Sequence, residues 1–445
     1  EILCSMAVVS NLANGDGGTP ATVSSRNFIV RLILPGLLQG KAQTFVTPML
    51  PIFVAVDLAG SHSMVGIIAS SYPISTFIFS PAVGVMMKHL HNSLASCLAL
   101  GVLVSTAVLS FAAQSVYVLL VIRMIGGIGN TSFDISQKAY MAAEVPPGIR
   151  GRITAQIAGA QKWAIMIAAL LSGVVAEHLA TRSIFLVQAS LSFTAMVLIA
   201  SHSLYLRRKS ADLDGADGEA LTASMPNVPL MSVLRDHWRG LLGAGLYCAM
   251  LNGIRNTWMV ALPLRGHHIG LSKLGIGASV AWYRACDATV TTIAAGHIMD
   301  KYGLKAAAIP SMLLMGIAFS LLSVVKGSWS LAAVALVFGV GNGFCGGILN
   351  AFATGLAPKN ARTQFLGLWK TVTSIGGICV PPFFGMVSDA SNLDLAGYFA
   401  SGAALCTLLW AVFVVQDVSK EAPPDSEVPQ REQISVSLAH NPSPA

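Results

Sequence analysis

The sequence predicts an all-α membrane protein in which twelve transmembrane helices form two pseudo-symmetric six-helix bundles. Three observations lead to this fold class: an apolar composition, twelve long apolar stretches, and a repeat that relates the two halves of the chain. Of the 445 residues, 54% are hydrophobic and 11% are charged, and the mean hydropathy is +0.67. Soluble domains carry about 25% charged residues, so a chain this apolar is expected to be surrounded by lipid.

Twelve stretches of the chain are long and apolar enough to cross a bilayer. A membrane-spanning helix needs about 20 mostly apolar residues. Backbone groups in hydrocarbon must bond within their own segment, so these stretches are expected to be helices. They cover residues 28–55, 65–88, 94–113, 115–141, 154–177, 184–206, 240–264, 274–299, 306–325, 330–356, 366–388 and 396–416.

The basic residues between these stretches indicate the orientation. With both termini in the cytoplasm, the cytoplasmic loops carry twelve Lys and Arg residues and the opposite loops carry four. This asymmetry satisfies the positive-inside rule. The sequence therefore predicts a multi-pass integral membrane protein with cytoplasmic termini, expected in the plasma membrane. The excess of positive charge is interpreted as topology, and no nucleic-acid partner is expected.

The chain partly repeats itself at one constant shift along the sequence, which we call the repeat shift. The repeat shift places Pro51 on Pro263 and Arg150 on Arg362, and it places Glu177 on Asp389, which is of the same chemical kind. It also pairs Gly84 with Gly296, Gly127 with Gly339, Gly129 and Asn130 with Gly341 and Asn342, Pro146 with Pro358, and Gly173 with Gly385. One shift that holds across six spans indicates a duplicated six-helix unit.

The repeat and the composition together predict five segments. They are an N-terminal cytoplasmic segment (1–27), a first six-helix bundle (28–206), a flexible cytoplasmic linker (207–239), a second bundle (240–416) and a disordered cytoplasmic tail (417–445). The linker and the tail are polar and lack the apolar residues needed for a packed core.

Two short motifs carry a family resemblance. Residues 296–305 read GHIMDKYGLK and fit the pattern Gly-x-x-x-Asp-Arg/Lys-x-Gly-x-Arg/Lys, and residues 121–130 read VIRMIGGIGN and fit Arg-x-x-x-Gly-x-Gly. With the two six-helix halves, they resemble the major facilitator superfamily of secondary transporters. The stretches 47–53 and 259–277 are most similar to its twelve-span drug:proton antiporter branch.

The resemblance implies a cytoplasmic gate. Its residues would be Glu144, Arg150, Gly296, Asp300, Gly303 and Arg362. Gly296 would let two helices approach closely, and Gly303 would take the left-handed backbone of a tight turn. The equivalent turn of the first half departs from the pattern, because Lys88 stands where the family has Asp.

Charged residues inside the spans mark candidate functional positions. Seven are basic (Lys41, Arg123, Lys138, Lys162, Arg255, Arg284 and Lys370) and two are acidic (Asp134 and Asp287). A charge at mid-bilayer costs about 2.5–3.5 kcal/mol on insertion scales. These side chains are therefore expected to face a wet cavity, a partner or the membrane interface.

Lys41 and Arg255 are the main candidates for binding a substrate. They lie within about a helical turn of equivalent positions in spans one and seven, and such a pair suits an anion bound between the two halves. Lys162 is a third candidate cation. Gln43, Asn252, Asn256 and Tyr283 are expected to add neutral hydrogen bonds. The alternative is that each cation pairs with Asp134 or Asp287 across the bundle.

Three charged residues are candidates for proton coupling. For Arg123 the family resemblance implies a role in proton coupling or gating rather than in substrate contact. The alternative is that it bonds to backbone carbonyls at a kink made by Gly126, Gly127 and Gly129. Asp134 lies four residues from Lys138 on one helix face, so a structural ion pair is an equal alternative. Asp287 lies three residues from Arg284, and its protonation would free Arg284 for a ligand.

These observations predict a secondary transporter that moves a small organic solute, expected to be anionic, by alternating access. The charged residues inside the spans leave open whether transport is coupled to protons. Two alternatives stay open: a proton-driven multidrug efflux antiporter and a non-transporting receptor with a transporter fold. No enzymatic activity, cofactor or metal site is expected. The expected partners are the solute, protons and the lipid bilayer, and the protein is expected to be a monomer.

Overall fold

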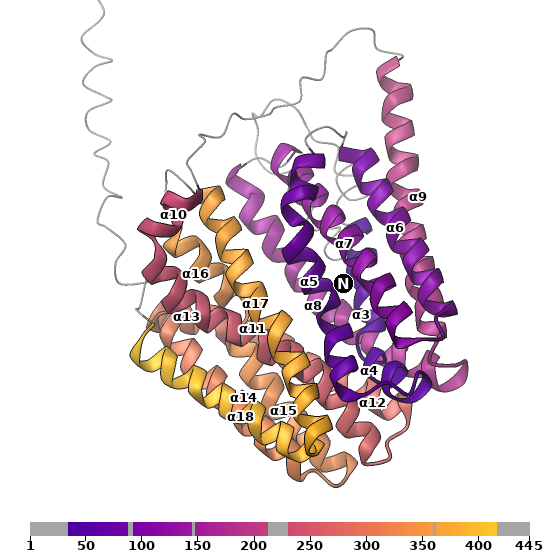
Figure 1. Ribbon diagram of the computed structural model, residues 1–445. Helices are drawn as coiled ribbons and strands as arrows, with labels where there is room; N and C mark the ends of the chain where they lie inside the picture. Colours follow the sequence, from indigo (N-terminus) through magenta and orange to yellow (C-terminus); the bar gives the residue numbers. More distant parts are fainter. Residues whose placement is uncertain (1–33, 88–91, 145–146, 212–229, 359–361, 416–445) are drawn as a thin grey trace, which may run out of the picture.

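The structure is a computed structural model that describes residues 34–87, 92–144, 147–211, 230–358 and 362–415. All regular secondary structure in these residues is helical. Figure 1 shows the helices as two groups that lie side by side and run roughly from one end of the molecule to the other. The sequence prediction of an all-α fold with two bundles is confirmed.

The described part of the first half contains six helical segments. The first is interrupted, because the three residues 47–49 separate α3 from α4 and a π-helical turn (η2) follows. The segments are α3 (Leu34–Val46) with α4 (Leu50–Ile52) and η2 (Phe53–Asp57), α5 (His62–Met87), α6 (Asn92–Ala112), α7 (Val116–Glu144), α8 (Pro147–His178) and α9 (Ser183–Ala211).

The second half repeats this arrangement after a short helix, α10 (Leu230–Asp236). Two of its segments are interrupted. A π-helical turn (η3) interrupts the segment that begins with α12, and a short non-helical stretch separates α15 from α16. The segments are α11 (Trp238–His268), α12 (Lys273–Val290) with η3 (Thr291–Ala295) and α13 (Gly296–Tyr302), α14 (Leu304–Val324), α15 (Ser328–Phe344) with α16 (Ile348–Leu356), α17 (Arg362–Ala390) and α18 (Leu393–Phe413).

Two helix pairs form most of the contact between the described parts of the two halves. Helix α5 packs along α17, and α8 packs along α12. The repeat shift carries α5 onto α12 and α8 onto α17, so the two contacts are equivalent. We call the end of the bundle where α9 ends and α10 begins the linker end, and the end where α5 begins and α17 ends the far end.

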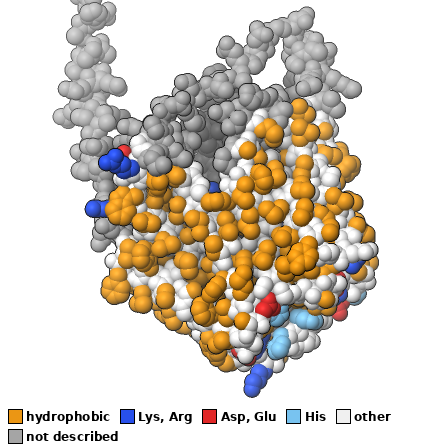
Figure 2. Space-filling model, viewed as in Figure 1, with side chains coloured by type: hydrophobic (Ala, Val, Ile, Leu, Met, Phe, Trp, Pro, Cys, Tyr) orange, Lys and Arg blue, Asp and Glu red, His pale blue; other side chains and the backbone are white. Residues whose placement is uncertain are grey.

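The outer surface is that of a membrane protein. Figure 2 shows hydrophobic side chains over most of the visible side of the molecule, with histidine side chains gathered at the far end and charged side chains near both ends. Eight helical segments of the described chain are long and apolar enough to cross a membrane. The other four segments, which begin at Leu34, Pro147, Trp238 and Lys273, carry five of the charged residues predicted inside the spans.

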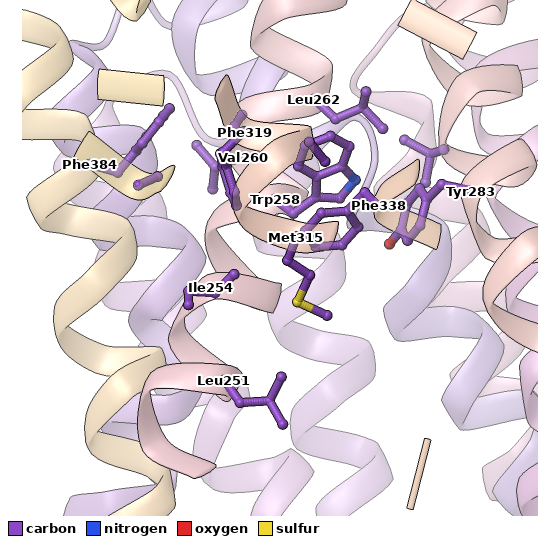
Figure 3. Packing of buried hydrophobic residues seen from close by; sticks show 14 of the residues in the cluster. Leu251, Ile254, Trp258, Val260, Leu262, Tyr283, Met315, Phe319, Phe338 and Phe384 are labelled. Carbon is purple, nitrogen blue, oxygen red and sulfur yellow. The ribbon is translucent and has the colours of Figure 1, made fainter. Parts of the chain in front are cut away.

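An aromatic cluster forms part of the core of the second half (Figure 3). The Trp258 ring stacks on Phe338 with centroids 3.9 Å apart, and Tyr283 and Phe319 meet Trp258 edge-on. All four side chains are buried. Tyr283, expected at the substrate site, therefore belongs to this core, where its hydroxyl hydrogen contacts the sulfur of Met259.

Close packing of α17 on α11 depends on a glycine. A β-carbon at Gly376 would lie 1.7 Å from the carbonyl oxygen of Ala249. Gly367 lies on the same helix, and a β-carbon there would meet no described atom within 4 Å. The two glycines form a matched pair for mutation.

We predict that Gly376→Ala lowers the thermal stability of the purified protein, because α11 and α17 must move apart. Overpacking of this kind costs about 1–3 kcal/mol. Gly367→Ala should keep or slightly raise the melting temperature, since alanine is the better helix former. Thermal unfolding in detergent measures both variants. Equal melting temperatures would contradict this account of the contact.

Candidate functional site

A cavity of about 530 Å³ lies between the two halves. Its lining comes from α3, α4, α5, α7 and α8 of the first half and from α11 of the second. Residues Gly36, Gln39, Gly40, Gln43, Thr47, Leu50, Pro51, Ala69, Tyr72, Pro73, Arg123, Asn130, Phe133, Asp134, Gln137, Gln161, Asn256, Met259 and Val260 form the lining. A volume of this size suits a small organic molecule.

Arg123 is the buried cation of this cavity. Its side chain is 8% exposed, and its guanidinium lies over the Tyr72 ring, 4.3 Å from the centroid. Its Nε has no hydrogen-bond partner among the described residues. A buried donor without a partner is costly, so this group is suited to an acceptor supplied by a ligand.

Carboxamides make up most of the remaining polar lining. They are Gln39, Gln43, Asn130, Gln137, Gln161 and Asn256. Gln39 Nε2 and Gln137 Oε1 also lack a hydrogen-bond partner among the described residues. Because a carboxamide both donates and accepts, it matches a hydroxyl group, which does the same. The cavity therefore offers several positions for a hydroxylated ligand and one for a negative charge.

Asp134 is the carboxylate of the cavity lining. It lies eleven residues after Arg123 on α7. Eleven residues bring a helix back to nearly the same face and advance it by about 16 Å. Because α7 runs toward the linker end, Asp134 lies nearer that end than Arg123 does. Its side chain is exposed.

Arg255 lies outside this lining and caps a broken helix instead. Its Nε donates to Asn342 Oδ1 at 2.6 Å. Its Nη2 reaches the backbone oxygens of Asn342 and Cys345 at 3.5 and 3.2 Å. These carbonyls lie where α15 ends, before α16 begins at Ile348, and the last carbonyls of a helix have no partner within it. A cation at a helix C-terminus is also favoured by the helix dipole.

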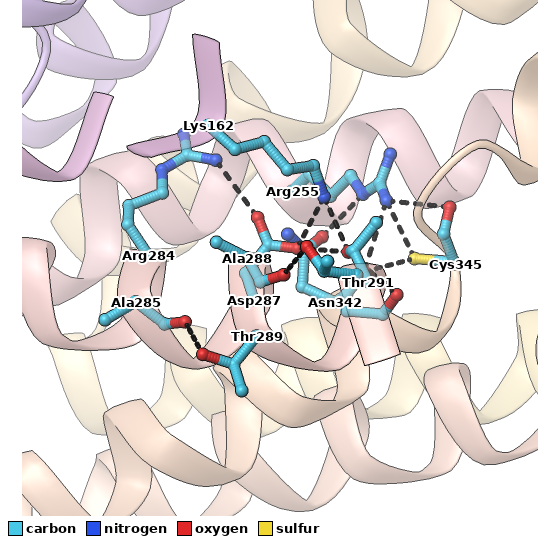
Figure 4. A network of polar contacts seen from close by, with 12 residues as sticks. Lys162, Arg255, Arg284, Ala285, Asp287, Ala288, Thr289, Thr291, Asn342 and Cys345 are labelled. Carbon is cyan, nitrogen blue, oxygen red and sulfur yellow. Dashed lines mark hydrogen bonds and ion pairs between the residues drawn. The ribbon is translucent and has the colours of Figure 1, made fainter. Parts of the chain in front are cut away.

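A second polar cluster centres on Asp287 (Figure 4). Its carboxylate is 5% exposed and lies 3.2 Å from Lys162 Nζ and 3.8 Å from Arg284 Nη1. Lys162 comes from α8 of the first half, so this ion pair links the halves. The sequence left open whether Lys162 binds an anion or pairs with an acidic residue across the bundle. In the structure it pairs with Asp287.

Thr291 completes this cluster from the π-helical turn η3. Its hydroxyl lies 2.6 Å from Lys162 Nζ, 3.2 Å from Asp287 Oδ1 and 3.1 Å from the Gly343 backbone oxygen. Single π-helical turns occur often at functional sites. Sequence patterns did not single out Thr291, because its role depends on this local irregularity.

Comparison with known proteins identifies the family. The family model of the Major Facilitator Superfamily matches residues 36–283 and 246–442. The chain belongs to this superfamily. It is 23% identical to the hexuronate transporter of Bacillus subtilis over 173 residues, which is 38% of this chain and 41% of that transporter. The match therefore spans less than half the length of the relative.

Solved structures share the major facilitator fold. The nucleoside transporter NupG has a TM-score of 0.67 at 12% identity and covers 85% of this chain and 96% of its own. The human organic anion transporter MFSD10 (TETRAN) has a TM-score of 0.58 at 18% identity, covering 87% of this chain and 99% of its own. At these identities the likeness shows the fold alone.

The structure separates the predicted substrate residues of this superfamily member. Gln43 and Asn256 line the cavity, and Gln43 Nε2 lies 3.3 Å from the Tyr72 hydroxyl. Asn252 instead donates to the Thr373 backbone oxygen at 3.1 Å. Lys41 is half-buried and, like Arg255, is not part of the lining. The expected clamp of Lys41 and Arg255 is therefore not formed in this cavity.

The gate residues are only partly described. Gly303 has φ +90° and ψ 167°, so the expected positive φ is confirmed, although ψ is extended. A β-carbon at Gly296 would meet no described atom within 4 Å, so the expected close helix approach is not seen. The side chains of Glu144, Arg150, Asp300 and Arg362, and that of Lys138, lie outside the described residues.

We predict that Arg255→Leu lowers the melting temperature in the absence of any ligand. The substitution removes the donor to the buried Asn342 Oδ1 and one of the donors to the Asn342 and Cys345 carbonyls, and an acceptor left unpaired costs about 1–3 kcal/mol. Arg255→Lys should lower the melting temperature by less, because lysine keeps the positive charge. It should not restore the wild-type value, because lysine lacks the forked donors of the guanidinium. Lys41→Leu serves as the control and should unfold close to the wild type. A wild-type melting temperature for Arg255→Leu would contradict the capping role.

Proposed function

We propose that this major facilitator protein is a secondary transporter of a small hydroxylated organic anion. The observation that supports this most is the buried Arg123, which lines the cavity with an unpartnered Nε among the described residues. A guanidinium recognises a carboxylate through two parallel hydrogen bonds. The carboxamides around it suit hydroxyl groups. Similarity to a hexuronate transporter, and the shared fold of an organic anion transporter, are consistent with this substrate class.

In this proposal the halves rock about the cavity and expose it to each side of the membrane in turn. Substrate moves the equilibrium only by binding the states with different affinity. Lining from both halves supplies that difference, because α7 carries Arg123 and α11 carries Asn256. Rocking changes the distance between these two helices and therefore the fit of the ligand. The transporter would act in the plasma membrane as a monomer with both termini in the cytoplasm.

We further propose that Asp287 couples transport to protons. Its carboxylate lies between Lys162 and Arg284, and the pair with Lys162 crosses the interface of the halves. Protonation removes the negative charge that holds both cations. Lys162 is then free to leave α12, so α8 and α12 can separate. Arg284 becomes available to a ligand in the same step.

A second candidate function is the efflux of lipophilic cations. Asp134 supports it, since an exposed carboxylate in the cavity lining can attract a cation. Stabilisation of the protein by lipophilic cations, lost in Asp134→Asn and kept in Arg123→Ala, would favour this function.

We predict that hexuronates and other hydroxylated carboxylates stabilise the purified protein against heat and that Arg123→Ala weakens their binding. A charge-assisted hydrogen bond contributes about 1.5–3 kcal/mol, so affinity should fall roughly 10- to 100-fold. Lys41→Ala should bind as the wild type does. Neutral sugars of the same size control for the charge. Unchanged affinity in Arg123→Ala would rule out this residue as the anion site.

We also predict that Asp287→Asn separates exchange from proton-driven uptake. In vesicles with labelled anion on one side and unlabelled anion on the other, exchange should persist. An imposed pH gradient should no longer accelerate uptake, because the side chain cannot be protonated. Equal stimulation by the gradient in the variant and the wild type would show that protons act elsewhere.

A further inference from the structure

Two helices of the bundle receive a carboxylate from the opposite half at their first turn. At α5, the backbone nitrogens of His62 and Ser63 donate to the two carboxylate oxygens of Asp389 on α17, each at 2.8 Å. The Ser63 hydroxyl donates to the same carboxylate. At α12, the backbone nitrogen of Leu274 donates to Glu177 on α8 at 3.2 Å. Both contacts lie at the far end.

The two carboxylates occupy equivalent positions of the duplicated unit. The repeat shift carries Glu177 onto Asp389, and the equivalent glycines Gly173 and Gly385 precede them by four residues. Each helix thus ends with Gly-x-x-x-acid, which reads GVVAE in α8 and GMVSD in α17. A spacing of four places the glycine and the acid on one helix face.

The glycines let each helix reach its partner's first turn. A β-carbon at Gly385 would lie 2.2 Å from the His62 backbone oxygen, and one at Gly173 would lie 2.9 Å from the Lys273 backbone oxygen. A side chain at either position would push the carboxylate away from the amides it accepts from.

Each first turn is completed only when the two halves meet. Ser61 and Ser272, the residues before α5 and α12, accept from the backbone nitrogens of Met64 at 3.3 Å and of Gly275 at 3.1 Å. A single cap leaves the other amides of a helix N-terminus without partners. The carboxylate from the opposite half accepts from two of those remaining amides at α5 and from one at α12. Its negative charge is favoured at the positive end of the helix dipole.

We infer that Glu177 and Asp389 form a pair of reciprocal caps that close the far end of the transporter. Each half supplies a carboxylate to the other, so the closed state gains both contacts at once. When the halves rock open at this end, both carboxylates must leave their amides and both first turns become exposed to water. The charge distribution predicts that this end faces away from the cytoplasm.

Hydrogen–deuterium exchange of the full chain in lipid nanodiscs tests this inference. Asp389→Asn should speed exchange at the first turn of α5, where the cap is lost, and also at the first turn of α12, whose own cap is intact. Charge-assisted contacts of this kind predict an increase of about five- to tenfold. Glu177→Gln should show the reciprocal pattern, and the double variant should exceed both.

Controls separate opening from unfolding and from a general loss of charge. Asp57→Asn removes an exposed carboxylate near the same end and should exchange as the wild type does. Peptides from α14 (Leu304–Val324) should stay protected in every variant. Gly385→Ala, which keeps all charges, should also speed exchange at both first turns, because it displaces Asp389.

Exchange that increases only at the helix whose own cap was removed would overturn the inference and reduce both carboxylates to local caps. The inference rests on the proposed rocking of the halves but not on the identity of the substrate. Because the experiment contains no ligand, a failure of anion binding would leave its outcome intact.

Discussion

The low dielectric of the membrane interior governs this structure, because every polar group there needs a partner. The hydroxyl of Thr291 and the carboxylate of Asp287 provide partners for Lys162, and the carbonyls at the end of α15 provide them for Arg255. Arg123 is the contrast, since it lines the cavity and its buried Nε has no hydrogen-bond partner among the described residues. A buried donor without a hydrogen-bond partner is costly. A ligand that binds in the cavity would supply the missing acceptor during each transport cycle.

The two halves have the same helix arrangement, but equivalent polar positions have different roles in each half. Gln43 and Asn130 line the cavity in the first half, and the repeat shift places them on Arg255 and Asn342 in the second. There the same two positions bond to each other and support the break between α15 and α16. A duplicated unit has thus kept its polar positions while one copy faces the ligand space and the other holds a helix end. The cavity is therefore lined mainly by the first half.

Sequence reasoning predicted the parts of the structure that depend on local pattern. Apolar length identified the helical segments, and the fixed shift identified two related halves. The positive φ of Gly303 followed from its place in a tight turn. The partners of the membrane charges could not be predicted, because they come from distant segments. The sequence gives no clear signal that a helix ends at Phe344. The contacts of Arg255 with that helix end were therefore not predicted, and Arg255 was expected to bind an anion instead.

The most direct test of the central claim is a structure of the protein with a bound hydroxylated carboxylate. The account predicts that the ligand carboxylate lies within hydrogen-bond distance of the Arg123 guanidinium, with its hydroxyl groups on the surrounding carboxamides. It also predicts that Arg255 keeps its bonds to Asn342 and Cys345 in the complex. A carboxylate bound between Lys41 and Arg255, with the bonds to Asn342 and Cys345 broken, would contradict the account.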